Sequence, residues 1–307
     1  MMVVKTDQLI SGKATHLRSL SPWLGWLPLL ILPTSAFELR KILPAWGFMW
    51  LLAIAIFVGL KWLTWWRTRR LVKHERWRSI AYLVAWPGMD ADSFLDLDEH
   101  PHRPSVGAWF SALFETALGA ICLWGVARLA PSSNGLLRGW LGMLGIILVL
   151  HFGSFQLLAL FWQSAGVSAA PIMRAPLRSH SLSEFWGKRW NLGFRQLSHD
   201  LIFRPLHGVM GVRGAGFLVF VISGLLHDLV ISVPAKGGYG LPTLYFVIQG
   251  AGVAAERSSV GRRFGLGRGG SGWIFMAVVT AVPAFWLFHR PFVNNVILPF
   301  MNAIGAL

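Results

Sequence analysis

The chain has 307 residues, of which 54% are hydrophobic and only 13% are charged, and its formal net charge is +15. Soluble domains usually carry about 25% charged residues, so this composition excludes an ordinary soluble domain. A single cysteine, Cys122, excludes an intramolecular disulfide framework. The basic residues cluster in loops between apolar segments, which favours a membrane surface over nucleic acid as their partner.

About 20 apolar residues cross a bilayer as a helix, and seven or eight segments of this chain qualify. In chain order they are Pro22–Leu39, Pro44–Leu63, Val106–Arg128, Gly139–Trp162, Gly214–Val233, Leu241–Ala255, Gly272–Phe288 and a final stretch from Phe292. The stretch Ser79–Met89 is too short to cross and is expected to be re-entrant or interfacial. The pattern predicts an all-α, polytopic transmembrane bundle of about seven to eight helices, with interfacial helices on the cytoplasmic side and one domain over residues 1–307.

Basic residues indicate the orientation, because loops that face the cytoplasm are enriched in Lys and Arg. Placing the N-terminus in the cytoplasm leaves 22 of the 28 Lys and Arg on that side. Those residues lie in the N-terminal head, Lys61–Arg103, Arg174–Arg213 and Arg257–Arg268, and the others are Arg40, Lys41, Arg128, Arg138, Lys236 and Arg290. The sequence therefore predicts an integral membrane protein with a cytoplasmic N-terminus, and its simple architecture favours the bacterial inner membrane. The head lacks a small-residue cleavage site, so a cleaved signal peptide is not expected.

A dense aromatic and basic segment follows the fourth predicted span. Its aromatic residues Phe185, Trp186, Trp190 and Phe194 interleave with Lys188, Arg189 and Arg195. This pattern suits a helix in the membrane interface whose cations lie near headgroups or phosphates, and composition alone favours a segment that only anchors the protein. Ser181 and Glu184 have the spacing of a helix capping box.

One histidine, His227, lies within the apolar run 217–233, which is long enough to cross a bilayer. An ionisable side chain at that depth is costly and usually faces a polar cavity, which makes His227 a candidate for function. The alternative is a histidine that is hydrogen-bonded between helices. His151 also lies inside a predicted span, where it suits a cavity lining, although a structural hydrogen bond is the favoured interpretation. Three further histidines near interfaces, where solvation is cheap, are interpreted as background: His199, His207 and His289.

Two motifs together resemble a known family. They are Phe185-Trp186-x-x-x-Trp190-Asn191 and Ser223-Gly-Leu-Leu-His227-Asp228, and they resemble motifs of the membrane-bound O-acyltransferase superfamily, above all its wax-synthase-like branch. The segments Phe246–Glu256 and Phe285–Pro291 also resemble later wax-synthase segments, and the similar core covers residues of about 80–300. The chain departs from the family in two ways. Many relatives have Glu where this chain has Asp228, and its amino-terminal third is less typical.

The resemblance implies an enzyme that transfers a fatty acyl group from acyl-CoA to the hydroxyl of a lipophilic alcohol at a lipid bilayer. His227 would be the base that takes the hydroxyl proton, and Asn191 would hold the thioester carbonyl or stabilise the oxyanion. Substrate contacts are expected from Trp186, Lys188, Arg189, Trp190, Arg195 and His151. Acyl-CoA is a co-substrate, and no metal or redox cofactor is implied. Asp228 lies about 100° around the helix from His227 and is expected to be structural.

Other functions stay open on the sequence alone. Acyl or acetyl transfer to a sterol, a glycerolipid or a secondary-metabolite hydroxyl uses the same chemistry. A small-molecule transporter or a membrane scaffold is the non-enzymatic alternative. Midplane polar groups suit a transporter, but no inverted repeat is visible in the sequence. The acyl chain length, the acceptor alcohol and the oligomeric state are not set by the sequence.

Overall fold

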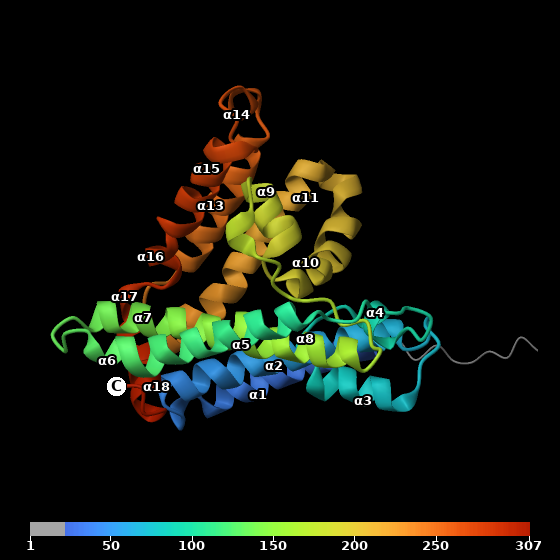
Figure 1. The fold of residues 1–307 in the computed structure, drawn as a ribbon, viewed down its shortest axis with the longest axis horizontal. Helices are drawn as coiled ribbons and strands as arrows, with labels where there is room; N and C mark the ends of the chain where they lie inside the picture. The colour runs from blue at the N-terminus through green and yellow to red at the C-terminus, as the bar shows by residue number, and fades with distance from the viewer. Residues whose placement is uncertain (1–21) are drawn as a thin grey trace, which may run out of the picture.

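The computed structural model describes residues 22–307, and its ribbon is shown in Figure 1. The N-terminal head, with the predictions of its cytoplasmic position and uncleaved start, lies outside the described residues. Within residues 22–307 the secondary structure is helical, with no β-strand. The prediction of an all-α helical membrane protein is therefore confirmed.

Five helical runs in the described part of the chain are long and apolar enough to cross a membrane. They are α2 (Ala45–Thr68), α5 (Val106–Ile121) with α6 (Ala127–Leu129), α7 (Gly135–Ile147) with α8 (Phe155–Ser164), the run Leu192–Ala235 and the run Gly269–Leu287. Leu192–Ala235 contains α10 (Leu192–Ser198), α11 (Arg204–His227) and α12 (Val233–Ala235), and Gly269–Leu287 contains α15 (Gly269–Ala281) and α16 (Ala284–Leu287). Such runs make this an integral membrane protein.

Two of the predicted spans form shorter helices that pair with longer ones. The first is α1 (Leu27–Glu38), which packs along α2, where the main chain at Leu29 lies against Gly59. The second is α13 (Leu241–Glu256), which packs along α11. The sequence-based number of seven spans therefore corresponds to five long helical runs and two shorter apolar helices among the described residues.

The chain end does not form a long apolar helix. It consists of α17 (Arg290–Phe292), a π-helical turn η9 (Val293–Ile297) and α18 (Leu298–Ala303). Val293 and Met301 are fully buried in a cluster with Met143 of α7. Apolar contact with α7 thus covers the tail. The stretch predicted to be too short to cross is the ten-residue α3 (Arg76–Ala85), followed by α4 (Ala91–Leu95).

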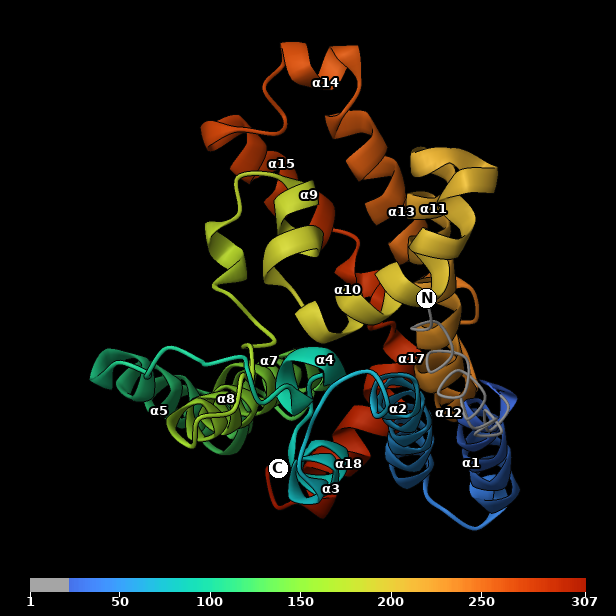
Figure 2. The ribbon, with the colours of Figure 1, turned by 90° about the vertical axis from the view of Figure 1, so that its right-hand side faces the viewer.

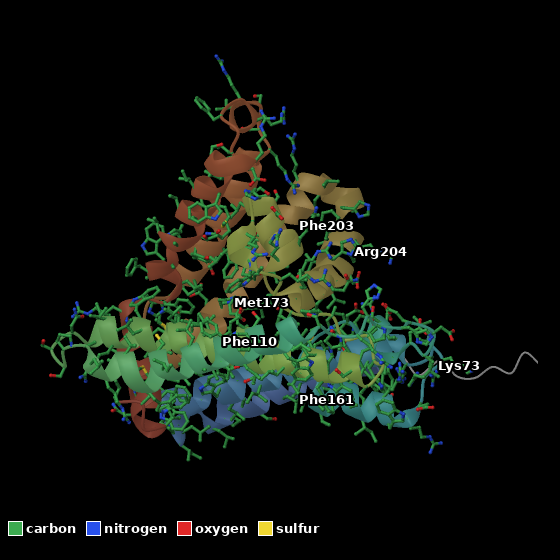
Figure 3. The ribbon with its side chains drawn as sticks, viewed as in Figure 1. Lys73, Phe110, Phe161, Met173, Phe203 and Arg204 are labelled. Atoms are coloured by element: carbon green, nitrogen blue, oxygen red, sulfur yellow. The ribbon has the colours of Figure 1, made fainter. Side chains whose placement is uncertain are left out.

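The helices form two groups that cross each other (Figures 1 and 2). A lower layer contains α1, α2, α3, α5, α7 and α8, and an upright group contains α9 (Leu182–Glu184), α10, α11, α13, α14 (Ser259–Arg263) and α15. One apolar cluster joins the groups, since it contains Met49 and Met143 from the lower layer and Tyr245 and Phe246 from α13 of the upright group. Large apolar side chains such as Phe110 and Phe161 are exposed on the lower layer (Figure 3), as lipid contact requires.

The long run Leu192–Ala235 folds back on itself at Gly211. This residue has φ 70° and ψ 167°, a backbone conformation that is essentially restricted to glycine. As a result, Leu201 packs in the same apolar cluster as Leu229 and Val233, and Figure 2 shows α11 turning at the upper right of the upright group, below α14. The run is therefore a hairpin of two arms, and only its second arm carries His227.

Candidate active site

The two motifs singled out in the sequence meet across an aromatic cluster. The ring of His227, at the end of α11, lies 4.4 Å from the ring of Phe246 on α13. The ring of Trp186 lies 5.7 Å from Phe246 and 5.9 Å from Phe220. Phe220 precedes His227 by seven residues, which is two helical turns, so both occupy one face of α11. That face therefore presents the imidazole towards the aromatic and basic segment.

A single hydrogen bond determines the protonation pattern of His227. Its Nδ1 lies 2.7 Å from the main-chain oxygen of Ser223. A carbonyl oxygen only accepts hydrogen bonds, so Nδ1 carries the proton. In the neutral ring Nε2 then holds a free lone pair, which is the form that a general base requires.

Close packing of α11 against α13 holds Phe246 beside His227. A Cβ atom on Gly224 would lie only 2.7 Å from the Cα atom of Thr243. Any larger residue at this position must push the two helices apart. Gly224 is thus part of the local sequence that positions the site.

Asp228 fastens the start of α13 to the end of α11. Its Oδ1 accepts hydrogen bonds from Gly240 N–H at 2.8 Å and from the Ser232 hydroxyl at 2.8 Å. Its Oδ2 accepts from Thr243 N–H at 3.0 Å and from the Thr243 hydroxyl. The carboxylate therefore caps α13, whose first N–H groups have no partner within their own helix. The expectation that Asp228 is structural is confirmed.

The interpretation of His289 as an interfacial background residue is wrong. Its side chain is buried, with 2% of its surface exposed, and burial lowers its pKa. Nδ1 accepts the Phe292 N–H at 3.2 Å, so Nε2 carries the proton and donates to Ser232 Oγ at 3.1 Å. Ser232 in turn donates to Asp228. In a nucleophilic triad the histidine takes the proton of the serine, whereas here His289 donates a proton to Ser232. These hydrogen bonds are therefore structural.

Asn191 is the N-cap of α10 and adopts a left-handed conformation with φ 46°. Its Oδ1 accepts the Phe194 N–H at 3.4 Å, and its own N–H donates to the sulfur of Met173 at 3.3 Å. Figure 3 shows Met173 where the upright group meets the lower layer. Because Oδ1 serves as the cap, the Nδ2 hydrogens are the groups left for a substrate. No hydrogen bond links Asn191 to His227, both of which lie in the described range.

Contacts with other side chains fix the positions of both predicted tryptophans. Trp186 Nε1 donates to Gln249 Oε1 at 3.3 Å, and the fully buried Gln249 donates to the Val279 oxygen at 2.7 Å. Trp190 stacks on Phe185 at 5.3 Å between ring centroids. The aromatic segment is therefore packed against α13 and α15 as well as being suited to an interface.

The three predicted phosphate ligands differ in their surroundings. Lys188 and Arg195 are exposed. Arg189 donates through Nε and Nη2 to Glu184 Oε1, both at 2.7 Å. The pKa of Glu184 is lowered, mainly by the hydrogen bond from His180 N–H and further by Arg189. Arg189 is thus already paired in this state, and phosphate binding by all three residues stays a prediction.

The capping box predicted at the start of α9 is present in a modified form. The Ser181 hydroxyl accepts the Glu184 N–H at 2.9 Å, as the motif requires. The carboxylate of Glu184 reaches back to the N–H of His180, one residue before the cap, at 2.9 Å. Glu184 therefore both caps the helix and pairs with Arg189.

His151 lies in a π-helical turn, η4 (Leu148–Ser154), between α7 and α8. Its Nδ1 is buried without a hydrogen-bond partner among the described residues, so it does not make the structural bond that the sequence favours. The adjacent Phe152 lies 6.4 Å from Trp190. This contact puts the turn beside the aromatic segment, while the role of His151 in substrate binding stays a prediction.

Comparison with known proteins supports the resemblance carried by the two motifs. The sequence profile of the membrane bound O-acyl transferase family matches residues 169–248, a segment that contains both Asn191 and His227. This match covers well under half of the chain, and over that segment the chain is similar to this family. The relatives that match include long-chain-alcohol O-fatty-acyltransferases, in agreement with the wax-synthase-like resemblance of the motifs.

Three relatives show the extent of the similarity. A probable long-chain-alcohol O-fatty-acyltransferase 7 of Arabidopsis thaliana is 29% identical over 150 residues, 42% of this chain and 42% of that protein. The long-chain-alcohol O-fatty-acyltransferase of Simmondsia chinensis is 29% identical over 143 residues, 42% of this chain and 40% of that protein. An acyl-CoA–sterol O-acyltransferase 1 of Arabidopsis thaliana is 33% identical over 67 residues, 20% of this chain and 19% of that protein. The matches therefore span less than half of each relative.

Several residues of this candidate site were not picked out from the sequence. Phe220 carries a usable signal, since it stands two helical turns before His227. Phe246 and Gln249 lie in the segment Phe246–Glu256, which resembles wax synthases, but their contacts with His227 and Trp186 are tertiary. Within residues 22–307 no three His, Cys, Asp or Glu side chains gather as a metal site.

A groove of about 470 Å³ lies close to the site but faces another way. Its lining residues are Leu225, Asp228, Leu229, Val233, Tyr239, Gly240 and Thr243. Leu225 and Leu229 are one turn apart, and His227 lies on roughly the opposite side of α11. The groove thus borders the Asp228 clamp, while the imidazole faces the aromatic cluster.

Proposed function

We propose that this protein transfers a fatty acyl group from acyl-CoA to the hydroxyl of a lipophilic alcohol. The observation that carries the proposal is the hydrogen bond from His227 Nδ1–H to the Ser223 oxygen, which leaves Nε2 as a base. Nε2 takes the hydroxyl proton while the alcohol oxygen attacks the thioester carbonyl carbon. The carbon–sulfur bond then breaks, and the imidazolium returns the proton to the leaving thiolate. The products are an ester and CoA, and no acyl-enzyme forms.

Asn191 supports the same reaction from the other motif. Its Oδ1 is engaged as the cap of α10, so its Nδ2 donates to the thioester carbonyl and to the oxyanion that develops from it. A donor of this kind contributes roughly 2.7–4 kcal/mol to transition-state stabilisation. In this proposal the substrate lies between His227 and Asn191 and bridges them.

The remaining side chains accommodate the two substrates. Lys188 and Arg195 meet the phosphates of acyl-CoA as exposed cations, and Arg189 joins them by exchanging its partner Glu184 for a phosphate oxygen. Trp186 and Trp190 provide an apolar wall for the acyl chain, and His151 lines the same region. Acyl-CoA is the co-substrate, and this scheme uses no metal or redox cofactor.

The cellular setting is part of the proposal. Acyl-CoA enters from the cytoplasm, because Arg174–Arg213 is among the basic segments that the charge distribution assigns to that face. The alcohol reaches the site from the lipid. We place the protein in a bacterial inner membrane with a cytoplasmic N-terminus.

A second acceptor class has specific support. One relative is named an acyl-CoA–sterol O-acyltransferase, and it is 33% identical over the 67 residues that match. A sterol hydroxyl, like a glycerolipid or secondary-metabolite hydroxyl, presents the same proton to His227. The test therefore compares several acceptors. It also includes an outcome that favours a transporter or a scaffold.

The test uses purified protein, labelled acyl-CoA and a panel that contains a long-chain alcohol, a sterol and a diacylglycerol. His227→Ala is expected to lower the rate of ester formation about 10²–10⁴-fold, the usual contribution of a general base. Its melting temperature is expected to stay close to wild type, because the side chain makes one hydrogen bond within its own helix.

The matched control is His199→Ala, which removes an exposed histidine that pairs with the adjacent Asp200. This variant is expected to retain wild-type activity. If folded His227→Ala keeps full turnover, His227 is not the general base of the reaction. Wild-type protein that forms no ester with any acceptor while remaining folded favours the transporter or scaffold.

A further inference from the structure

A second cavity, of about 440 Å³, lies where the turn between α1 and α2 meets α12, and it plays no part in the proposed reaction. Its lining contains three cations, Arg40, Lys41 and Lys236, and five apolar residues: Leu43, Ala45, Phe48, Val233 and Pro234. Arg40 and Lys41 are nearly 200 residues away from Lys236 in sequence. Figure 2 shows α12 beside α1 and α2. The fold therefore brings together cations from two distant turns.

The charge of this cavity is uncompensated. No acidic residue lines it, and among residues 22–307 none of the three cations takes part in an ion pair. Like charges in one cavity repel each other, so their convergence is unfavourable unless an anion binds there. They are also three of the six cations that lie outside the predicted cytoplasmic segments. The side that is poor in basic residues thus concentrates half of them at one place.

The backbone at Lys236 adds an independent observation. This residue follows α12 in a left-handed conformation with φ 53°. Glycine or asparagine usually occupies such a helix end, because a larger side chain is strained there. The chain nevertheless has a lysine at this point, and its side chain borders the cavity. Strain of this kind is typical of positions that serve binding.

The other half of the cavity suits a hydrocarbon chain. Phe48 and Pro234 are buried, and Val233 and Leu43 are partly buried. The cavity lies at the ends of two apolar helices, where a membrane changes from hydrocarbon to headgroups. Its ligand must combine an anionic head with an apolar body. Arginine and lysine together recognise phosphate by charge and hydrogen bonds.

We propose that this cavity binds the phosphate of an anionic phospholipid, with Arg40, Lys41 and Lys236 around the headgroup and the acyl chain along Phe48 and Val233. Each basic side chain near an anionic headgroup contributes a favourable electrostatic interaction. The bound lipid fastens the α1–α2 turn to the end of α12, about two turns after His227. The proposal does not depend on the acyl-transfer reaction.

The test is native mass spectrometry of purified protein with added phosphatidylglycerol or phosphatidylcholine. Wild type is expected to retain phosphatidylglycerol over phosphatidylcholine by about 10- to 100-fold, as three such contacts allow. The triple variant R40Q/K41Q/K236Q removes the three charges, keeps polar side chains and is expected to lose this preference. All three side chains are exposed, so the variant is expected to fold, which its melting temperature checks.

The matched control is K73Q/R103Q/R178Q, which removes the same charge from exposed positions elsewhere. Figure 3 shows Lys73 at the far end of the lower layer. This control is expected to retain the preference for phosphatidylglycerol. Equal retention by wild type and R40Q/K41Q/K236Q overturns the proposal. Displacement of the lipid by millimolar inorganic phosphate or by acyl-CoA assigns the phosphate to a soluble source and overturns the lipid as ligand.

Discussion

Two histidines near Asp228 show how similar surroundings produce different chemistry. At His289 both ring nitrogens are engaged, one by Phe292 N–H and the other by Ser232. At His227 a carbonyl one turn earlier engages Nδ1, and among residues 22–307 Nε2, beside Phe246, makes no hydrogen bond. In the proposed reaction, burial and polar contact are therefore poor guides to the base. A free lone pair on a fixed ring is the better guide.

The same contrast applies within Asn191, and it predicts the largest effect after that of His227→Ala. Its Oδ1 is engaged as a cap and its Nδ2 is free, so Asn191→Asp keeps the cap acceptor and removes the donor. Aspartate also tolerates the left-handed backbone. We expect the rate of acyl transfer to fall about 10²–10³-fold, the usual cost of losing an oxyanion donor.

The measurement is single-turnover ester formation together with the melting temperature. Asn191→Gly is the control for the backbone, because it removes the side chain without strain at φ 46°. It is expected to lose both activity and some stability of α10. An Asn191→Asp variant with wild-type turnover means that the amide does not donate to the reacting carbonyl.

The engaged histidine predicts the opposite outcome. His289→Ala leaves the Ser232 hydroxyl and the Phe292 N–H without their partner in a buried place. Such a loss costs about 1–3 kcal/mol of unfolding free energy. We expect a lower melting temperature and an unchanged rate per folded molecule. If His289→Ala has normal stability and a large loss of rate, His289 takes part in the reaction and does not differ from His227 in role.

Sequence reasoning succeeded where the determining contacts are local. The Ser181 cap and the apolar helices follow from spacing and hydropathy, which act within a few residues. Helical periodicity separated Asp228 from the imidazole of His227, although its partners Gly240 and Thr243 are 12 and 15 residues away. The orientation drawn from the basic loops stays a prediction. The joint role of Asn191 and His227, which the resemblance implies and no local rule provides, also stays a prediction.

Sequence reasoning failed where contacts between distant residues determine the structure. His289 is near an apolar end in sequence, but its partner Ser232 is 57 residues away. The fold-back at Gly211 depends on one glycine backbone conformation inside a run with helical composition. The aromatic contact of His227 with Phe246 depends on the packing of α11 against α13. These features arise from tertiary packing, which one-dimensional patterns do not encode.

The smallest expected effect is the pH dependence of stability that His289 produces. Burial holds the pKa of folded His289 below the ordinary value of about 6.5. Below pH 6.5 the unfolded chain therefore binds a proton that the folded protein resists, so the unfolded state holds more protons. Stability then falls as the pH falls through this window and rises with increasing pH, by at most about 1.4 kcal/mol per pH unit for one group. The nearby Asp228 carboxylate opposes the shift and makes the slope smaller.

His289→Gln tests this slope, because glutamine has one donor and one acceptor and no charge at any pH. Melting temperatures are measured in steps from pH 7.5 to pH 5 for both proteins. Wild type is expected to lose more stability than His289→Gln over this range, since all other titrating groups are common to both. A parallel pair of curves would show that His289 takes up its proton equally in the folded and unfolded states. The pKa of His289 would then be the same as that of an exposed histidine. Only the activity of the variants would then distinguish His289 from His227.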